Sequence, residues 1–313
     1  RRPPRSTLLP YTTLFRSLHD AQRRDFTINA LYARRDGSLV DLVEGLADLA
    51  RRRVRFIGDA KARIREDTLR ILRLFRFHAA YGAGPMDGEA LHAAICLRAG
   101  LSTLSRERVR VELLKLLGAQ GAAETLGIMS DAGLLQPLFA GIADVGLFGR
   151  LADLEARLNV PADPVRRLGA LTLRVPDDVE RLREKLRLSN GEAQRLAALA
   201  PPLPASVAGA LAAEPEGPVA RAFLYHVGAE AARDRALLAA ARGAQGLEGF
   251  IGATAHWVRP KLPFGAADLM ARGLKPGPAL GAALARAEAA WVAVDFPSDT
   301  QTLDAILARA ITP

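Results

Sequence analysis

The stretch REDTLRILRLFRFHAAYG, residues 65–82, combines charged and apolar side chains with the period of a helix. One acidic and three basic residues recur at every third position: Asp67, Arg70, Arg73 and Arg76. Large apolar residues fill most of the positions between them. Steps of three residues turn by about 300° on an α-helix, so the pattern predicts one helix over residues 67–81 with the four charges in a slanting row about 13 Å long.

The two ends of this row differ in chemistry. Asp67 can accept a hydrogen bond from the exocyclic amine of a nucleobase, and Arg70 can donate to the neighbouring ring nitrogen. Cytosine and adenine present that amine, whereas guanine and uracil present a carbonyl that the carboxylate would repel. Arg73 and Arg76 suit phosphate oxygens. The alternative is a surface helix whose charges pair at i,i+3, and the spacing alone leaves both interpretations open.

Composition sets wider limits. The chain has 313 residues, half of them apolar, which predicts a globular protein of two or three domains. Abundant alanine favours helices. The formal charge of +9 favours a polyanionic partner. A GC-rich genome, which encodes more arginine and alanine, would give the same excess of positive charge.

The chain has one cysteine, Cys96, which excludes an intrachain disulfide and a cysteine zinc cluster and fits a reducing cytoplasm. We predict that Cys96 packs within a helix. The five histidines are scattered without metal-ligand spacing, and we expect His78 to pack rather than catalyse. No apolar run is long enough to span a bilayer, so we expect no membrane partner.

Residues 1–17, RRPPRSTLLPYTTLFRS, differ from the rest of the chain in composition. They are rich in proline and lack alanine and helical periodicity. We interpret residues 1–18 as a segment that is not native, similar to a translated sequencing adapter, and expect the natural protein to have a different upstream region. The alternative is a basic arm that contacts RNA phosphates.

Local signals predict a small sheet followed by helices. Asp36-Gly37 suits the tight turn of a hairpin whose return strand is residues 39–41, and residues 54–57 suit another brief strand. The periodicity predicts helices at residues 60–65, 67–81, 88–97, 105–117, 121–132, 147–158, 163–173, 177–187, 190–199, 218–226, 229–242, 266–272, 278–293 and 299–310. Proline-rich loops at residues 201–207 and 214–218 predict a boundary, and residues 243–252 predict a second one.

Several motifs occur in the same order as in a known protein family. RRDFTINA (23–30), the hairpin, GLADL (45–49) and GDAKARIREDTLRILRLFRF (58–77) resemble the class II tRNA nucleotidyltransferase and bacterial poly(A) polymerase family. The EDxxR nucleotide-recognition motif of that family is present as Glu66, Asp67 and Arg70. LSRERVRVELLKLL, residues 104–117, is similar to the neck helix of the family, with Arg108 and Glu112 at the expected positions.

The resemblance implies a nucleotide-binding set with two supporting residues: Arg24, Asp25, Asp67, Arg70, Arg73 and Arg76, supported by Asn29 and Glu66. Asp67 and Arg70 would read the base, and Arg73 and Arg76 would contact the triphosphate. Asp25 would help to distinguish ribose from deoxyribose and Asn29 would set the local geometry, unless both are cap and turn residues. Glu66 would orient Arg70 or favour a helix N-terminus. We expect Arg108 and Glu112 to form a neck salt bridge rather than to contact substrate.

One feature of the family is missing from the chain. The Gly-rich element and the metal-binding Asp-x-Asp pair should lie upstream of residues 23–30, and neither is present. We therefore assign no catalytic and no metal-binding residue. Mg²⁺ is expected for the intact enzyme, and we expect this chain to be inactive.

The resemblance implies addition of CMP and AMP from CTP and ATP to the 3′ end of tRNA. The alternatives are a poly(A) polymerase of the same family and a non-catalytic RNA-binding protein. The implied fold is mainly α, with a remnant of a nucleotidyltransferase head followed by helical neck, body and tail. After residues 1–18, the expected segments are 19–65 (head), 66–145 (neck), 146–245 (body) and 246–313 (tail, for tRNA binding).

Overall fold

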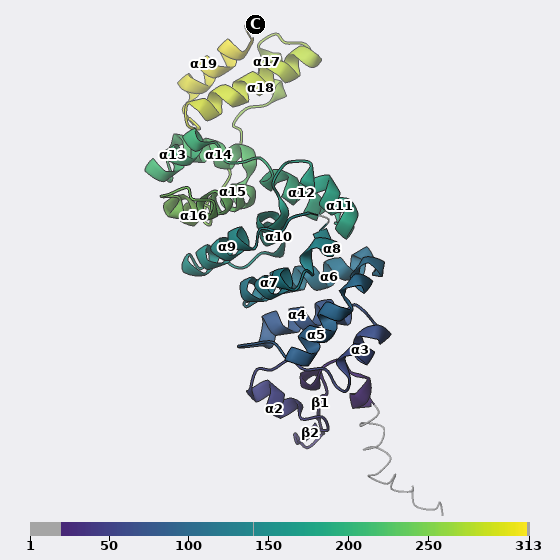
Figure 1. The fold of residues 1–313 in the computed structure, drawn as a ribbon. Coiled ribbons are helices and arrows are strands. Elements are labelled where there is room, and N and C mark those ends of the chain that lie inside the picture. Colours follow the sequence, from purple (N-terminus) through teal and green to yellow (C-terminus); the bar gives the residue numbers. More distant parts are fainter. Residues whose placement is uncertain (1–19, 140, 312–313) are drawn as a thin grey trace, which may run out of the picture. The chain divides into compact units, whose positions relative to one another are not determined.

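The computed structural model describes residues 20–139 and 141–311 (Figure 1). Contacts divide the chain into two compact units, one that ends at Ala200 and one that begins at Pro201. The division coincides with a proline-rich stretch where the sequence predicts a boundary. The finer division into head, neck, body and tail stays a prediction, and the interpretation of residues 1–18 falls outside the described residues.

The described part of the first unit holds a short 3₁₀ helix and a hairpin followed by helices. Their bounds are η1 Thr27–Asn29, β1 Leu31–Ala33, β2 Leu39–Asp41, α2 Gly45–Ala50, α3 Ala60–Glu66, α4 Arg70–Tyr81, α5 Gly88–Cys96, η2 Arg98–Thr103, α6 Arg106–Leu117, α7 Ala122–Asp131, α8 Leu135–Phe139, α9 Val145–Arg157, α10 Pro164–Thr172, α11 Asp178–Leu186 and α12 Asn190–Leu199.

The second unit is helical throughout its described residues. Its elements are α13 Ala205–Ala213, α14 Pro218–Val227, α15 Ala229–Ala241, α16 Glu248–Ala253, α17 Ala266–Ala271, α18 Pro278–Ala293 and α19 Thr300–Ile311. The expectation of a mainly α fold is confirmed. No helix of the described residues is long and apolar enough to cross a membrane.

The predicted hairpin is present. β1 and β2 pair antiparallel, with Leu31 opposite Asp41 and Ala33 opposite Leu39. Gly37 has a φ of +82°, and Asp36 accepts hydrogen bonds from the main-chain N–H and the hydroxyl of Ser38. These are the local features that make Asp-Gly a tight turn.

The strand expected at residues 54–57 is not formed as such. Only an isolated bridge joins Phe56 to Phe26, whose ring centroids lie 4.8 Å apart. The main-chain N–H of Thr27 donates to the oxygen of Arg55, and that of Ile57 donates to the oxygen of Asp25. This bridge places residues 24–27 beside the chain that leads into α3.

The helix predicted over residues 67–81 begins later, at Arg70. Asp67 is extended, with φ −153° and ψ 105°, and follows the last residue of α3. Its side chain accepts from the main-chain N–H of Leu69 at 3.1 Å, and its main-chain oxygen accepts from that of Arg70. The prediction that one helix carries the whole row of charges is therefore wrong, because the Asp67 side chain forms a turn with Leu69 between α3 and α4.

Most predicted helices are present within a few residues of their expected bounds. The short helices α8, α13 and α16 were not predicted, and α13 includes part of the expected loop 201–207. Pro278 begins α18, the helix position at which the fixed φ of proline is favourable. Cys96 is exposed at the end of α5, so its prediction as a packing residue is wrong.

The apolar face of α4 is buried against neighbouring helices of the first unit. α4 buries Ile71, Leu72, Leu74, Phe75 and Ala79, the i, i+3, i+4 pattern of an amphipathic helix. It packs against α6 and α7, and α6 also packs against α10. The polar side of the N-terminal half of α4 is thereby directed to one pocket.

Candidate functional site

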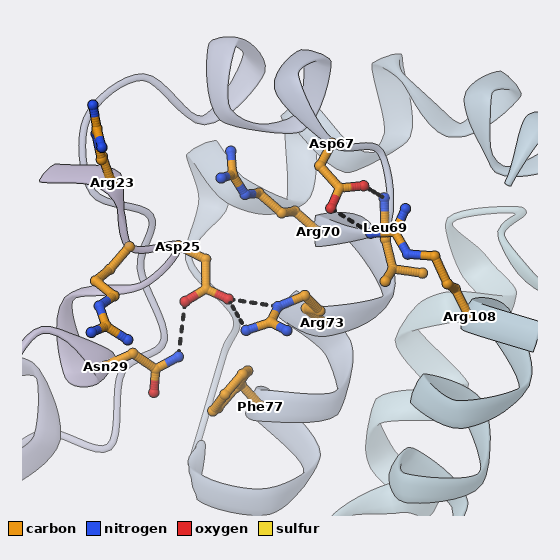
Figure 2. Close-up of a pocket in the computed structure, with 10 residues that line it drawn as sticks. Arg23, Asp25, Asn29, Asp67, Leu69, Arg70, Arg73, Phe77 and Arg108 are labelled. Atoms are coloured by element: carbon orange, nitrogen blue, oxygen red, sulfur yellow. Dashed lines mark hydrogen bonds and ion pairs between the residues drawn. The ribbon is translucent and has the colours of Figure 1, made fainter. Parts of the chain in front are cut away.

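A pocket of about 470 Å³ lies in the first unit (Figure 2). Residues 23–25, η1, the turn between α3 and α4, α4 itself and α6 all contribute to it. Its lining consists of Arg23, Arg24, Asp25, Asn29, Asp67, Leu69, Arg70, Arg73, Phe77 and Arg108. The volume lies within the range of small-molecule sites, and the lining is strongly cationic.

Asp25 connects η1 to α4 through hydrogen bonds with Asn29 and Arg73. Its Oδ1 accepts from the N–H of Phe26 and from the Asn29 amide, both at 2.9 Å. Its Oδ2 accepts from Arg73 Nε at 2.6 Å and also contacts Nη2, as Figure 2 shows. A carboxylate has about four acceptor positions, and these contacts use them all.

The surroundings of Asp25 also set its ionisation. Burial alone would raise the pKa of its carboxyl. The Asn29 amide, the Arg73 guanidinium and the Phe26 N–H together outweigh burial and lower that pKa below its usual 3.8. Asp25 is therefore an anion that holds Asn29 and Arg73 in place.

Asp67 is oriented from a distant helix. Its Oδ2 accepts from Arg108 Nη2 of α6 at 2.7 Å, and its Oδ1 accepts from the N–H of Leu69. Two of its acceptor positions remain available to a ligand. The Asp67–Arg108 pair is partly exposed, at 34% and 50%, so it contributes under about 1 kcal/mol and acts mainly to orient the carboxylate.

Arg70 is oriented by contacts with α3. Its Nη1 donates to Glu66 Oε2 at 2.5 Å and to the main-chain oxygen of Arg63 at 2.7 Å. These contacts use Nη1 and leave Nη2 and Nε without a hydrogen bond to any residue within 20–139 and 141–311. The hydrogen bond from Arg70 is the largest of the influences that lower the pKa of Glu66 below its usual 4.5. Glu66 is the last residue of α3, so of its two expected roles the geometry fits the orientation of Arg70.

Two of the expected site residues lie outside the pocket lining, Glu66 and Arg76. Arg76 Nε lies 2.7 Å from Glu112 Oε2, and its guanidinium stacks 4.1 Å from the centroid of Phe77. The other expected residues line the pocket together: Arg24, Asp25, Asn29, Asp67, Arg70 and Arg73. The expected neck salt bridge between Arg108 and Glu112 is not formed in the described residues: Arg108 pairs with Asp67 and lines the pocket, and Glu112 pairs with Arg76.

Sequence reasoning did not place Arg23, Leu69, Phe77 or Arg108 at the pocket. Arg23 and Leu69 are direct neighbours of expected residues. Phe77 lies one turn beyond Arg73, so helical spacing was a signal for it. Nothing local signalled Arg108, because α6 approaches the α3–α4 turn only in the tertiary structure.

The described residues do not fit a magnesium site. They contain no group of three or more His, Cys, Asp and Glu side chains placed to hold a metal ion. The carboxylates at the pocket, Asp25 and Asp67, are each paired with an arginine, whereas Mg²⁺ needs carboxylate oxygens directed at the ion. No two aspartates anywhere in the sequence are two positions apart.

His78 is buried and serves packing, as expected. Burial lowers its pKa, and the charge of Glu124 opposes that effect. It is therefore a neutral core residue at ordinary pH.

Family models match two stretches of the chain. Residues 7–55 match the model described as "Poly A polymerase head domain". Residues 87–145 match the model described as "Probable RNA and SrmB- binding site of polymerase A".

Solved structures share the fold. The Bacillus stearothermophilus CCA-adding enzyme in complex with CTP has a TM-score of 0.68 at 24% identity, covering 94% of this chain and 74% of that one. The Thermotoga maritima CCA-adding enzyme complexed with tRNA has a TM-score of 0.64 at 18% identity, with the same coverage.

Curated relatives are closer in sequence. The chain is 38% identical over 175 residues to the mitochondrial CCA tRNA nucleotidyltransferase 1 of Danio rerio, which covers 55% of this chain and 40% of that protein. It is 34% identical over 308 residues to the CCA-adding enzyme of Limosilactobacillus fermentum, which covers 93% of this chain and 72% of that enzyme. The extent of this last match shows that the chain belongs to the family of CCA-adding enzymes.

Proposed function

We propose that the intact protein transfers CMP and AMP from CTP and ATP to the 3′ end of tRNA. The observation that carries this proposal is that Asp67 and Arg70 line the same pocket. Each is fixed by a partner, Arg108 and Glu66 respectively, and each keeps hydrogen-bonding capacity for a ligand. The names of the curated relatives support the same reaction.

We propose a contact for each part of the nucleotide. Asp67 accepts from the exocyclic amine of cytosine or adenine, and Arg70 donates to the adjacent ring nitrogen. Arg73 and Arg24 face the phosphates. Asp25 helps sugar selection through Asn29 and Arg73, because its own acceptor positions are already used. We give Arg76 the role of holding Glu112, since it stands outside the pocket lining.

We also propose that the chain as printed binds nucleotide without turnover. The family reaction needs Mg²⁺, and the described residues do not form a site for it. What these residues do is select the base, hold the triphosphate and order the sugar. The protein would act in the cytoplasm, where its tRNA and nucleotide substrates occur.

The test is to titrate the chain with CTP, ATP, UTP and GTP by calorimetry. CTP and ATP should bind at least about tenfold more tightly than UTP and GTP, because a carbonyl facing Asp67 loses a hydrogen bond and adds repulsion. Asp67→Asn should remove this preference, because an amide can donate to that carbonyl. Asp153→Asn, at an exposed site on α9, is the matched control.

The outcomes separate the candidates. Equal affinity for all four triphosphates contradicts base selection by this pocket. Tight binding of ATP without CTP would favour a poly(A) polymerase of the same family.

A further inference from the structure

Arg63 lies behind the pocket and contacts both segments that form its walls. Its side chain is 11% exposed on α3. Its Nη2 donates to the main-chain oxygen of Arg23 at 2.8 Å and to that of Arg24. Its Nη1 donates to Glu66 Oε2 at 2.7 Å. A single guanidinium thus joins the backbone of residues 23–24 to the carboxylate at the end of α3.

The same residue reaches the base-reading arginine twice. Glu66 Oε2, which accepts from Arg63, also accepts from Arg70 Nη1. The main-chain oxygen of Arg63 accepts from the same Arg70 nitrogen at 2.7 Å. Arg70 begins α4, and these contacts turn its long side chain back toward α3. Without them the side chain would be free to sample other rotamers.

The contacts come with a local cost that a purely structural residue would avoid. Arg63 Nε is buried and makes no hydrogen bond within the described residues. An unpaired buried N–H is unfavourable, so an apolar side chain would suit a position that served packing alone. The fork of a guanidinium is what allows one side chain to reach two main-chain oxygens and a carboxylate together.

We propose that Arg63 is a positioning residue that couples the segment of Arg23 and Arg24 to the base-reading Arg70 through Glu66. This inference rests on the proposed function of the pocket. Arg63 holds the phosphate side and the base side of the site at a fixed separation, so that one nucleotide engages both. Its loss relaxes the choice of base, although Arg63 does not line the pocket itself.

A second contact, independent of Arg63, also holds residues 24–27 in place. The bridge between Phe26 and Phe56 also holds residues 24–27 against the chain that leads into α3. The segment therefore stays attached when Arg63 is replaced, and the specific effect on Arg70 can be measured.

The experiment compares Arg63→Met, Arg63→Lys and Arg65→Met in the full chain. Arg65 is an exposed residue of the same helix outside the pocket lining, so it is the matched control. Dissociation constants for ATP and UTP are measured by calorimetry, with the unfolding midpoint of each variant. ATP and UTP share their triphosphate and ribose, so the ratio of their constants reports the reading of the base alone.

We expect Arg63→Met to reduce the preference for ATP over UTP by about tenfold, the equivalent of one lost charge-assisted hydrogen bond. Arg63→Lys should restore part of it, because the ammonium keeps the charge but not the fork. Arg65→Met should keep the preference of the unchanged chain.

An equal loss of ATP and UTP affinity, or an unchanged ratio, overturns the positioning role. If Arg63→Met does not fold, Arg63→Lys decides: a reduced ratio supports the role and an unchanged ratio overturns it. A chain that shows no preference before any substitution would instead contradict the proposed function, which separates the two failures.

Discussion

Arg73 and Arg76 are one turn apart on α4, yet their guanidiniums have different surroundings. Arg73 lines the pocket and contacts Asp25 through Nε and Nη2. Its Nη1 is 4.0 Å from Glu112, beyond hydrogen-bond distance. Arg76 is close to Glu112 and to the Phe77 ring. Their spacing of three residues predicts the same phosphate-binding role for both arginines. Their contacts differ, because only Arg73 lines the pocket.

Arg73→Gln should therefore weaken the binding of ATP by about tenfold to a hundredfold and that of adenosine much less, because the proposed charged hydrogen bond from Arg73 to phosphate is lost. Arg76→Gln is the matched comparison. It should lower stability through Glu112 and keep the ratio of ATP to adenosine affinity. Calorimetric titration of both ligands checks this. A larger change of the ratio in Arg76→Gln than in Arg73→Gln would reverse the assignment.

Asp25 gives a pH dependence of stability. Its pKa is depressed in the folded state, so its ionised form stabilises the fold above the unfolded pKa of about 3.9. That contribution is lost as the pH falls through the lower folded pKa. Asp25→Asn should consequently cost more stability at pH 7 than at pH 3. Urea unfolding at the two pH values measures the difference, and an equal cost at both would contradict it.

At the scale of elements, a buried ionic cluster holds α6 in place. Glu155 of α9 contacts Arg166 and Arg167 of α10, and all three are at most 5% exposed. Arg167 Nη1 also donates to the main-chain oxygens of Leu117 at 2.8 Å and Ala119 at 3.1 Å, at the end of α6. Because α6 carries Arg108, this cluster indirectly sets the position of one pocket residue.

Glu155→Gln should lower the free energy of unfolding by about 3–5 kcal/mol, since it removes the carboxylate that both buried guanidiniums contact. Glu180→Gln is the control. Glu180 is 65% exposed and its contact with Arg183 spans 3.5 Å, so its loss should cost under about 0.5 kcal/mol. Denaturant unfolding of both variants provides the comparison. A cost for Glu155→Gln no larger than that of the control would mean that the cluster does not hold the helices together.

At the scale of the whole molecule, the relevant quantity is a formal charge of +9. A polyanion such as tRNA releases bound cations when arginines contact its phosphates. The logarithm of the affinity should fall with the logarithm of salt concentration, with a slope near one for each phosphate contacted. Filter binding of tRNA between 50 and 200 mM salt tests this.

The same tRNA mixed with CTP, ATP and Mg²⁺ should gain no nucleotide from the chain as printed. Labelled nucleotide in the RNA would contradict the proposed lack of turnover. Salt-independent tRNA affinity would contradict a phosphate-based interaction.

Local sequence determined much of this protein. The Asp36-Gly37 turn, the helix periods and the proline-rich boundary depend on neighbouring residues, so they could be predicted. The break before Arg70 also had a local signal, because an aspartate side chain readily accepts from the main-chain N–H two residues on and so favours a turn. The sequence did not reveal this break, because charges at every third residue fit one continuous helix equally well.

The tertiary structure decided which charges meet. Arg108 reaches Asp67 across 41 positions, and Arg73 reaches Asp25 across 48. No local pattern carries such pairings, because they depend on how α4 packs against α6 and on the bridge between Phe26 and Phe56. The sequence by itself determined the residue types that can select a nucleotide. Packing decided which of them share one pocket, because contacts between residues distant in sequence form only when the helices bury their apolar faces.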